Sequence, residues 1–314
     1  MGGESAQHVR AFVVRPFLCP LAMFQTFLYN GKMRVVRAIM LGDVVGELGI
    51  KALEEGLPGI IEGNSVSFVV ANGENAADGF GLTDAALRRI FAAGVDVVTS
   101  GNHVWEKREF WQTLETDDKV LRPANYPGEA AGRGWLCAEK DGVSWVVINV
   151  QGRELLPLID CPFRCFDNII KNVGCAPPGS RASRDDSGDS VLPNACPIVL
   201  VDFHAESTRE KEALAYYIDG RASLLAGTHT HVQTADERVL PQGTAYITDL
   251  GMTGISDSVI GMDPDICMER ARKQVLYRME PAADRGGGNS GVQIQGIIAE
   301  IRADTGKAVS VSRL

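Results

Sequence analysis

Short apolar runs rich in β-branched residues recur along the chain after Met33. In chain order they cover residues 35–41, 67–71, 95–100, 145–150, 198–202, 224–226 and 244–248. Near-continuous apolar runs of this length are typical of strands that are buried on both faces of a sheet. Helical spacing occurs between them at 83–93, where Thr83 is a favourable capping residue, and at 207–218. The alternation predicts a layered α/β architecture.

Two stretches depart from this pattern, and a pair of strands follows near the C-terminus. Residues 1–32 carry an apolar patch that no small-residue cleavage site follows, so we expect a poorly ordered extension or an over-long start there. Residues 33–314 form the predicted single domain. Within it the periodicity fails between 153 and 194, and the polar, Pro/Gly/Ser-rich part at 175–190 predicts a mobile insertion near 171–195. Residues 292–301 and 308–312 indicate a closing hairpin.

The composition argues against a protein that coats nucleic acid, but it is compatible with one that binds a small phosphate substrate. With 31 basic and 40 acidic residues the net charge is −9, so no basic excess exists to coat nucleic acid backbones. A small phosphate substrate stays compatible, because bound divalent ions can reverse the sign of a site. The seven cysteines are odd in number and scattered, which does not indicate a disulfide framework. No run is long enough to cross a membrane.

Four of the cysteines bracket the irregular region, namely Cys161, Cys165, Cys175 and Cys196. A small zinc site is one interpretation of such a group. Their spacing matches no standard zinc pattern, however, so we interpret them as reduced thiols without a functional role.

Polar, metal-capable residues follow five of the predicted strands directly. The clusters are Gly42-Asp43, Asn72-Gly73-Glu74-Asn75, Gly101-Asn102-His103, Asp202-Phe203-His204 and Gly227-Thr228-His229-Thr230-His231. Open α/β sheets place their ligand sites just past the carboxyl ends of the strands. The sequence therefore predicts that five separate segments deliver side chains to one edge of the fold.

Histidine usage strengthens this prediction. The chain has five histidines, and four of them lie in these clusters, while the fifth, His8, falls in the 1–32 stretch. A single histidine is usually structural, but four at strand ends favour a metal site. Histidine, carboxylate and asparagine together suit Mn, Fe, Zn or Co rather than calcium. A set of this size is sufficient for two ions that share a bridging carboxylate.

The ordered clusters resemble the motif series of the calcineurin-like metallophosphoesterases. The closer resemblance is to the bacterial YmdB-like branch, described as 2′,3′-cyclic-nucleotide phosphodiesterases. It is carried by GDVVG at 42–46, NGENAA at 72–77, GNH at 101–103, DFHAE at 202–206, GTHTHVQTAD at 227–236 and GMTG at 251–254. The likeness runs from Met33 to the C-terminus, apart from the stretch around 175–193.

Two positions depart from the broader superfamily. Val45 stands where its first motif usually has histidine, and Glu74 stands where its second motif usually has aspartate. Both departures resemble the YmdB-like pattern. They leave one metal ion short of a ligand, and Asn75 is the candidate to supply it.

The resemblance implies a fold, a cofactor and residue roles. The fold would have two packed β-sheets flanked by helices, with the metal site at the carboxyl ends of the strands. The cofactor would be two divalent ions, Fe or Mn in first place and Zn, Co or Mg as alternatives. Glu74 would bridge them; Asp43, Asn75 and His231 would hold one ion, and Asn102, His204 and His229 the other. The resemblance also implies a homo-oligomer, and we expect a cytoplasmic protein.

The implied reaction assigns a role to His103. It stands beside a ligand without being assigned as one, and it would protonate the departing ribose oxygen as a general acid. Arg122 and Arg153 are candidates to contact the substrate, since arginine matches phosphate geometry, although surface or loop-stabilising salt bridges explain them equally well. Asp249 and the loop 251–254 follow a strand and are candidates to line the site. Trp105 and Trp111 fit a core better than a base-stacking platform.

Three functional interpretations remain open at this stage. The first is a phosphodiesterase acting on small cyclic nucleotides or on RNA ends that carry a 2′,3′-cyclic phosphate. The second is a phosphomonoesterase or 3′,5′-cyclic-nucleotide enzyme with the same metal centre, because ligands do not determine substrate. The third is a metal-binding regulatory or scaffold protein with little turnover. His103 favours catalysis, since a purely structural metal site is closed and needs no spare proton donor.

Overall fold

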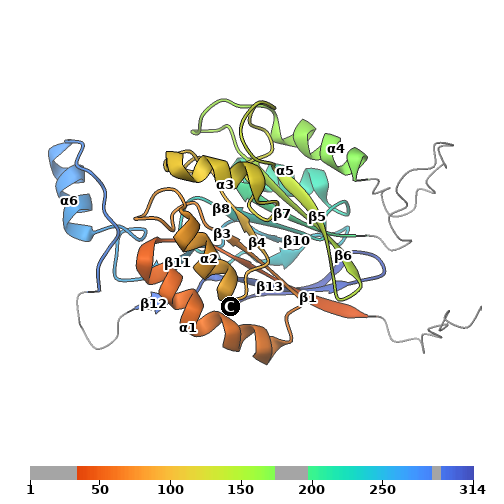
Figure 1. Ribbon diagram of the computed structural model, residues 1–314. Coiled ribbons are helices and arrows are strands. Elements are labelled where there is room, and N and C mark those ends of the chain that lie inside the picture. The colour runs from red at the N-terminus through yellow and green to blue at the C-terminus, as the bar shows by residue number, and fades with distance from the viewer. Residues whose placement is uncertain (1–33, 174–196, 285–290) are drawn as a thin grey trace, which may run out of the picture. The chain divides into compact units, whose positions relative to one another are not determined.

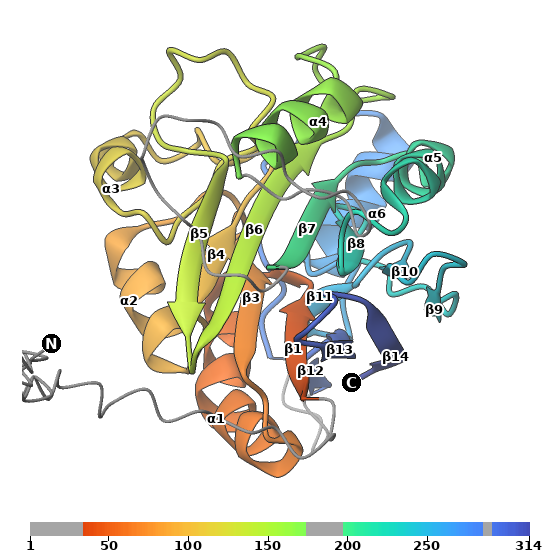
Figure 2. The same cartoon turned by 90° about the vertical axis from the view of Figure 1, so that its right-hand side faces the viewer.

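The computed structural model describes residues 34–173, 197–284 and 291–314. The extension predicted at 1–32 lies outside the described residues. So does nearly all of the insertion predicted near 171–195. The described part of the chain forms three sheets with helices against them (Figures 1 and 2).

The first sheet has five strands in the order β14-β13-β1-β3-β4. Their bounds are β1 Val35–Leu41, β3 Phe68–Asn72, β4 Val97–Thr99, β13 Gly296–Arg302 and β14 Ala308–Arg313. Strands β1, β3 and β4 are parallel, so their carboxyl ends meet at one edge. The antiparallel pair β13 and β14 is the predicted closing hairpin, and β13 also pairs antiparallel with β1.

The second sheet has six strands in the order β5-β6-β7-β8-β10-β9. Their bounds are β5 Trp135–Lys140, β6 Val143–Gln151, β7 Ile198–His204, β8 Leu224–Thr228, β9 Arg238–Val239 and β10 Ala245–Ile247. Strands β6, β7, β8 and β10 run parallel, which again gathers carboxyl ends at one edge. A small third sheet contains β2 Asp43–Val44, β11 Met252–Ile255 and β12 Val292–Gln293.

The two large sheets pack face to face through one apolar core. It combines inward side chains of the first sheet, such as Met40 and Val70, with those of the second, such as Leu200 and Leu224. Phe68 and Trp145 stack across it with ring centroids 4.7 Å apart. Aromatic pairs of this kind contribute beyond the area that they bury. The stack therefore helps to hold the two sheets at a defined separation.

Helices cover the outer faces of both sheets (Figure 2). Against the first sheet lie α1 Gly46–Asn64, α2 Asp84–Ala92, η1 Arg108–Phe110 and α3 Trp111–Thr116; against the second lie α4 Pro162–Asn172 and α5 Thr208–Ile218. Thr83 caps α2 as predicted, because its hydroxyl accepts a hydrogen bond from the Ala86 N–H at 3.3 Å. The last helix, α6 Pro264–Lys273, has no buried residue and lies beyond the edge of the sheets (Figure 1).

The predicted layered α/β fold with two packed, helix-flanked sheets is confirmed, as are the strands and the two helices expected from the sequence. Other helices were missed, and α1 and α4 are the longest of these. α1 contains Pro58 and several glycines and lacks a side-chain cap at its start, so no local signal identifies it. α4 falls in the stretch where periodicity fails, and it begins at Pro162 without a side-chain cap.

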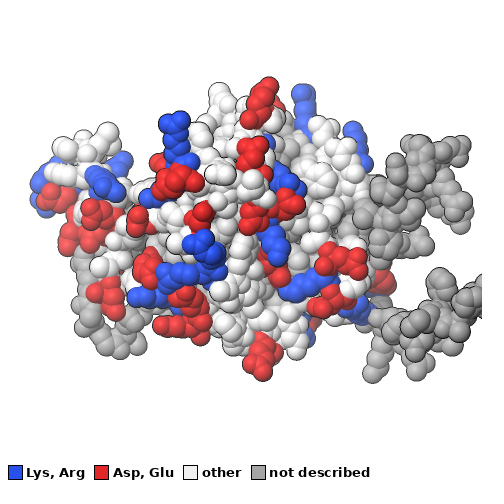
Figure 3. Space-filling model, in the orientation of Figure 1, with Lys and Arg blue, Asp and Glu red and all other residues white. Residues whose placement is uncertain are grey.

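The surface agrees with the charge balance of the sequence. On the face shown in Figure 3, basic and acidic side chains are interspersed, with no large area of one sign. Among the described residues, no helix is long and apolar enough to span a bilayer. Cys161 and Cys165 are free thiols, and the other two cysteines of that predicted group lie outside the described residues.

Replacing Phe68 with alanine tests the inter-sheet core. Phe68 is 2% exposed and stacks on Trp145, so the substitution leaves a cavity between the sheets. We expect the free energy of unfolding to fall by about 3–5 kcal/mol in urea titrations followed by circular dichroism. Tyr216→Ala, at a position that is 59% exposed, is the control and should change it by less than about 1 kcal/mol. Equal effects of the two substitutions would contradict this assignment.

Candidate metal centre

The five clusters predicted from the sequence meet where the strand ends of both large sheets come together. From the first sheet come the turns after β3 and β4, which carry Glu74 and Asn102. From the second come His204, the last residue of β7, and His229, the residue after β8. Asp43 belongs to β2, which pairs in parallel with β11 at Met252. Parallel pairing thus brings segments far apart in the sequence to one place.

Three ligand-type atoms converge on the His204 ring. Its Nε2 lies 3.0 Å from Glu74 Oε1, 3.0 Å from Asn102 Oδ1 and 3.0 Å from His229 Nδ1. Glu74, His204 and His229 also have their ligand atoms within 4.8 Å of one another. A single imidazole N–H can donate to one acceptor well, but not to three in different directions. The donor set therefore fits one divalent cation held by oxygen and nitrogen ligands.

A second group of ligand-type atoms lies beside the first. Asn75 Nδ2 is 2.8 Å from His231 Nε2, and Asp43 Oδ1 is 3.8 Å from the same nitrogen. Asp43 Oδ1, Glu74 Oε1 and Asn75 Oδ1 are buried, and none of the three has a partner with hydrogen-bond geometry. Glu74 Oε1 is near His204 Nε2, yet that contact lacks such geometry as well. Buried unpaired oxygens are costly, and a second cation would satisfy these three.

Burial and close packing shift the protonation equilibria of these groups. Burial raises the pKa of Asp43, and it lowers that of His229, with a further contribution from His204, to about 3. His229 is therefore a neutral imidazole, the form that binds metals. Burial opposes the charging of Glu74 and His204, but the combined attraction of each to its charged neighbours, its partner in this pair first, outweighs the effect of burial. That attraction holds the pKa of Glu74 below and the pKa of His204 above the usual value.

A chain of buried hydrogen bonds orients the His204 ring. His204 Nδ1 is 3.0 Å from Thr228 Oγ1, and the Thr228 hydroxyl donates to Asp202 Oδ1 at 2.7 Å. The other oxygen of Asp202 accepts hydrogen bonds from Asn72 and Thr99. Burial, only partly offset by these bonds, raises the pKa of Asp202 to about 6. Such outer partners fix the tautomer and direction of a metal-binding imidazole, here leaving Nε2 for the centre.

A buried ion pair holds the loop that carries the other two histidines. Lys211 Nζ donates to Asp249 Oδ2 at 2.7 Å, and both side chains are about 1% exposed. Asp249 also accepts from the backbone N–H groups of Thr230 at 3.2 Å and Gly251 at 2.9 Å. Asp249, which the sequence suggested as a lining residue, thus positions the loop from behind. His229 and His231 themselves have φ values of 98° and 64°, an unfavourable backbone region for non-glycine residues.

Gly101 permits the close packing at the centre. A Cβ atom at this position would lie 2.2 Å from His204 Nε2, far inside van der Waals contact. The strand-to-turn segment that carries Asn102 can therefore reach His204 only without a side chain at residue 101.

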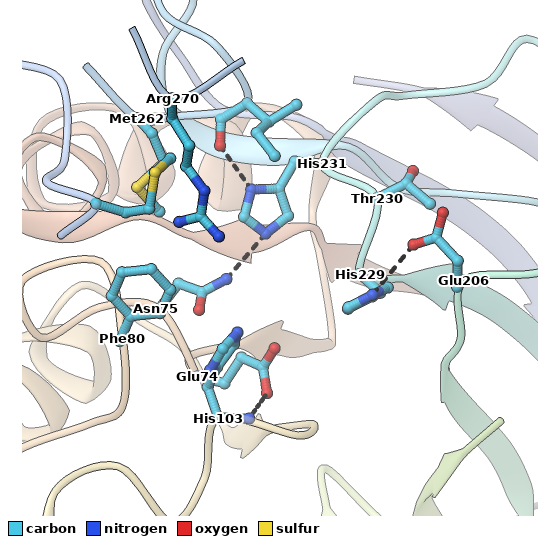
Figure 4. Close-up of a pocket in the computed structure, with 12 residues that line it drawn as sticks. Glu74, Asn75, Phe80, His103, Glu206, His229, Thr230, His231, Met262 and Arg270 are labelled. Atoms are coloured by element: carbon cyan, nitrogen blue, oxygen red, sulfur yellow. Dashed lines mark hydrogen bonds and ion pairs between the residues drawn. The ribbon is translucent and has the colours of Figure 1, made fainter. Parts of the chain in front are cut away.

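The centre opens into a cavity of about 490 Å³ (Figure 4). The His103 ring lines it, and the His103 backbone N–H donates to Glu74 Oε2 at 2.9 Å. His103 Nδ1 lies 3.3 Å from Glu106 Oε1, and its ring makes an edge contact with Phe80 at 4.9 Å. His103 is thus anchored to a ligand-type residue through its backbone, while its side chain faces the space where a substrate would lie.

The two arginines suggested as substrate contacts lie elsewhere. The buried Arg122 guanidinium donates to the carbonyl oxygens of Ala131, Pro123 and Ala130, and it lines a different cavity. The Arg153 backbone N–H donates to Glu210, and Arg153 does not line the metal cavity.

Other lining residues escaped the sequence analysis. The cavity wall also contains Phe80, Glu206, Thr230, Ile260, Met262, Arg270 and Met279. Glu206 lies within the DFHAE motif and contacts His229 Nε2 at 3.2 Å, so the motif itself could have identified it. Arg270 comes from α6, and no local pattern marks it.

The chain is similar to several known proteins. Residues 39–314 match the family model described as "YmdB-like protein". A 2′,3′-cyclic-nucleotide 2′-phosphodiesterase of Bacillus subtilis is 38% identical over 89% of this chain and 96% of its own length. The crystal structure of a hypothetical protein from Thermus thermophilus superposes with a TM-score of 0.74 at 36% identity, covering 89% of this chain and 98% of that one. A novel phosphatase of Mycoplasma pneumoniae gives a TM-score of 0.77 at 29% identity, covering 90% and 94%.

Gly101→Ala tests the close approach at the centre. The added methyl group would collide with the His204 ring, so the ring or the Asn102 turn must move. We expect metal affinity to fall by roughly 10–100-fold, measured as bound metal per chain after dialysis against graded chelator. Gly128→Ala is the matched control, because a Cβ there meets nothing within 4 Å. Unchanged metal content in a folded Gly101→Ala protein would show that this packing is not required.

Proposed function

The chain belongs to the YmdB-like family, and we propose that it is a dinuclear-metal phosphodiesterase that hydrolyses 2′,3′-cyclic nucleotides. The substrate class is proposed from the activity in the name of the Bacillus subtilis relative, which is 38% identical to this chain. The reaction type is supported by the geometry of the site. The phosphatase from Mycoplasma pneumoniae supports phosphate-ester chemistry for this fold.

One observation carries the proposal, namely that two groups of ligand-type atoms adjoin at Glu74. In the proposed centre, Asn102, His204 and His229 would hold one ion, and Asp43, Asn75 and His231 would hold the other. Glu74 would be shared by both ions, since one of its oxygens is near His204 and the side chain is buried. Asparagine contributes neutral oxygens, which keeps the centre from becoming too anionic to accept a phosphate.

The ions, when bound, would supply Lewis-acid activation of water and neutralisation of the phosphate charge. The chain's own residues would hold the cyclic phosphate at the mouth of the cavity. Hydrolysis adds water to phosphorus and breaks one bond between phosphorus and a ribose oxygen. The departing oxygen needs a proton, which His103 would donate. The ring is placed for this by its backbone contact with Glu74 and by Phe80 at its edge.

Further properties are part of the same proposal. We favour Fe or Mn as the ions, because the set mixes imidazole with oxygen ligands, and Zn, Co or Mg are the alternatives. RNA ends with a 2′,3′-cyclic phosphate would fit the same chemistry. We also propose a cytoplasmic homo-oligomer whose domain spans residues 33–314.

Glu74→Gln tests the centre and the substrate class together. With Mn²⁺ present, we expect the wild type to prefer 2′,3′-cyclic AMP over 3′,5′-cyclic AMP and p-nitrophenyl phosphate. Removing the bridging charge should lower kcat/KM for 2′,3′-cyclic AMP by at least roughly 100-fold and reduce bound metal. Glu109→Gln, at an exposed position, is the control. Preference for p-nitrophenyl phosphate would indicate a phosphomonoesterase, and metal binding without any turnover would favour a regulatory or scaffold role.

His103→Gln separates proton donation from metal binding. The backbone contact with Glu74 does not depend on the side chain, so bound metal should stay at the wild-type level. We expect kcat to fall by about 100- to 10,000-fold, the usual contribution of a general acid. Rates should recover partly with a substrate whose leaving group needs no proton, such as a p-nitrophenyl diester. A loss of metal in this variant would instead assign His103 to the centre.

A further inference from the structure

A second cavity adjoins the metal cavity on the side of α6. It has a volume of about 390 Å³ and shares Phe80, His103, Arg270 and Met279 with the first. Its own lining adds Asp78, Glu106, Lys107 and Arg278. The shared residues make the two cavities neighbours, so one ligand can occupy both.

The charges in the second cavity are unevenly paired. Lys107 Nζ is 3.3 Å from Asp78 Oδ2, and Glu106 contacts His103, so these three charged groups already have partners. Arg270 makes one long hydrogen bond, from Nη1 to the Tyr277 carbonyl at 3.4 Å.

Neither Arg270 nor Arg278 forms an ion pair with any residue in the parts of the chain that the structure describes. Several other arginines of the domain pair with carboxylates. Arg89 bridges Glu47 and Glu54, and Arg238 pairs with Glu212. Two guanidinium groups without a carboxylate among the described residues therefore face one cavity, immediately beside a site proposed to bind a phosphodiester.

Guanidinium groups match phosphate in shape and charge. Their planar fork of N–H donors forms two parallel hydrogen bonds to phosphate oxygens, and these charge-assisted bonds are among the strongest in proteins. Arg270 lines both cavities, whereas Arg278 lines only the second. In Figure 4 the Arg270 guanidinium points into the metal cavity near His231 and Asn75. Arg278 is thus placed to bind a part of the ligand that lies away from the reacting phosphorus.

We propose that Arg270 and Arg278 form a subsite for a second phosphate group of the substrate. This inference rests on the proposed function and names its substrate more closely. In a nucleoside 2′,3′-cyclic phosphate the reacting group occupies one edge of the ribose, and the remaining ribose hydroxyl that can carry a phosphate is at the 5′ position. The substrate is therefore a 2′,3′-cyclic nucleotide with a phosphate on its 5′ oxygen.

Such a phosphate has two chemical sources. It is a monoester in a 5′-phosphorylated mononucleotide, and it is a diester in a dinucleotide or longer RNA that ends in a cyclic phosphate. Binding a non-reacting part of the substrate contributes to kcat/KM, because the enzyme can use that binding energy to position the reacting phosphorus. The subsite would make the enzyme discriminate between substrates with and without this phosphate.

The test compares three substrates on the metal-loaded full chain. They are 2′,3′-cyclic AMP, its 5′-phosphorylated form, and the dinucleotide ApA with a terminal 2′,3′-cyclic phosphate. We expect kcat/KM to rise by roughly tenfold or more when the 5′ phosphate is present, the effect of one charged hydrogen-bonded contact. A gain with the monoester alone identifies the mononucleotide source, and an equal or larger gain with the dinucleotide identifies RNA ends.

Arg278→Gln should reduce this gain to about twofold or less, and Arg278→Lys should keep part of it because the charge remains. The control is Arg272→Gln, because Arg272 is exposed on α6 and lines neither cavity. The gain should persist in this control. An Arg278→Gln enzyme that retains the full gain, or a wild type that shows none while it hydrolyses 2′,3′-cyclic AMP, would overturn the subsite. Absence of hydrolysis of all three substrates would overturn the proposed function itself.

A binding measurement provides a readout independent of turnover. Calorimetric titration of the metal-loaded protein with adenosine 3′,5′-bisphosphate and with adenosine 3′-phosphate isolates the contribution of the 5′ phosphate. The bisphosphate should bind roughly tenfold more tightly to the wild type and with nearly equal affinity to Arg278→Gln. Equal affinities for the wild type would contradict the subsite. Thermal melting of each variant verifies that the fold is retained.

Discussion

Three side chains converge on His204 Nε2, and this close approach determines how the segments around it must be arranged. Glu74, Asn102 and His229 each place an oxygen or nitrogen 3.0 Å from this atom. Imidazole nitrogens and buried oxygens at this spacing cannot all be satisfied by protons, but they can be satisfied by a cation. Many surrounding features serve to bring them so close. One such feature is the absence of a side chain at Gly101, since any side chain there would overlap the His204 ring.

Holding ligands from two sheets at one point requires a stiff frame. The stacked rings of Phe68 and Trp145 and the apolar core around them fix the separation of the sheets, and close-packed interiors deform little. In a similar way, the buried Lys211–Asp249 pair fixes the position of the loop that carries His229 and His231. A pair of this kind contributes little net stability compared with apolar residues. The Asp249 carboxylate also accepts from the backbone N–H groups of Thr230 and Gly251, which indicates that position, rather than stability, is what the pair supplies.

The sequence predicts what local patterns encode, and it fails where tertiary structure decides. Buried parallel strands appear as continuous apolar runs, so the strands and the clusters at their ends could be located, including Glu74 and His204. α1 could not, because Pro58 and its glycines contradict helix propensity, and packing in the tertiary structure stabilises it instead. Arg122 was suggested by residue type, yet its donors bind backbone carbonyls. Whether an arginine is free for a ligand depends on its neighbours in space.

The residues proposed for the reaction and those proposed to select the substrate lie in different kinds of segment. The ordered motifs supply the groups that would bind ions and donate a proton, and these can serve any phosphate ester. The α6 segment is different, because it has no buried residue and contributes Arg270 to the cavity from outside the sheets. Residues that need not support a core are free to vary with the ligand. If the proposed subsite is correct, substrate preference would depend in part on the segment 256–282, which supplies Arg270 and Met262 to the cavity wall and carries none of the metal-binding motifs.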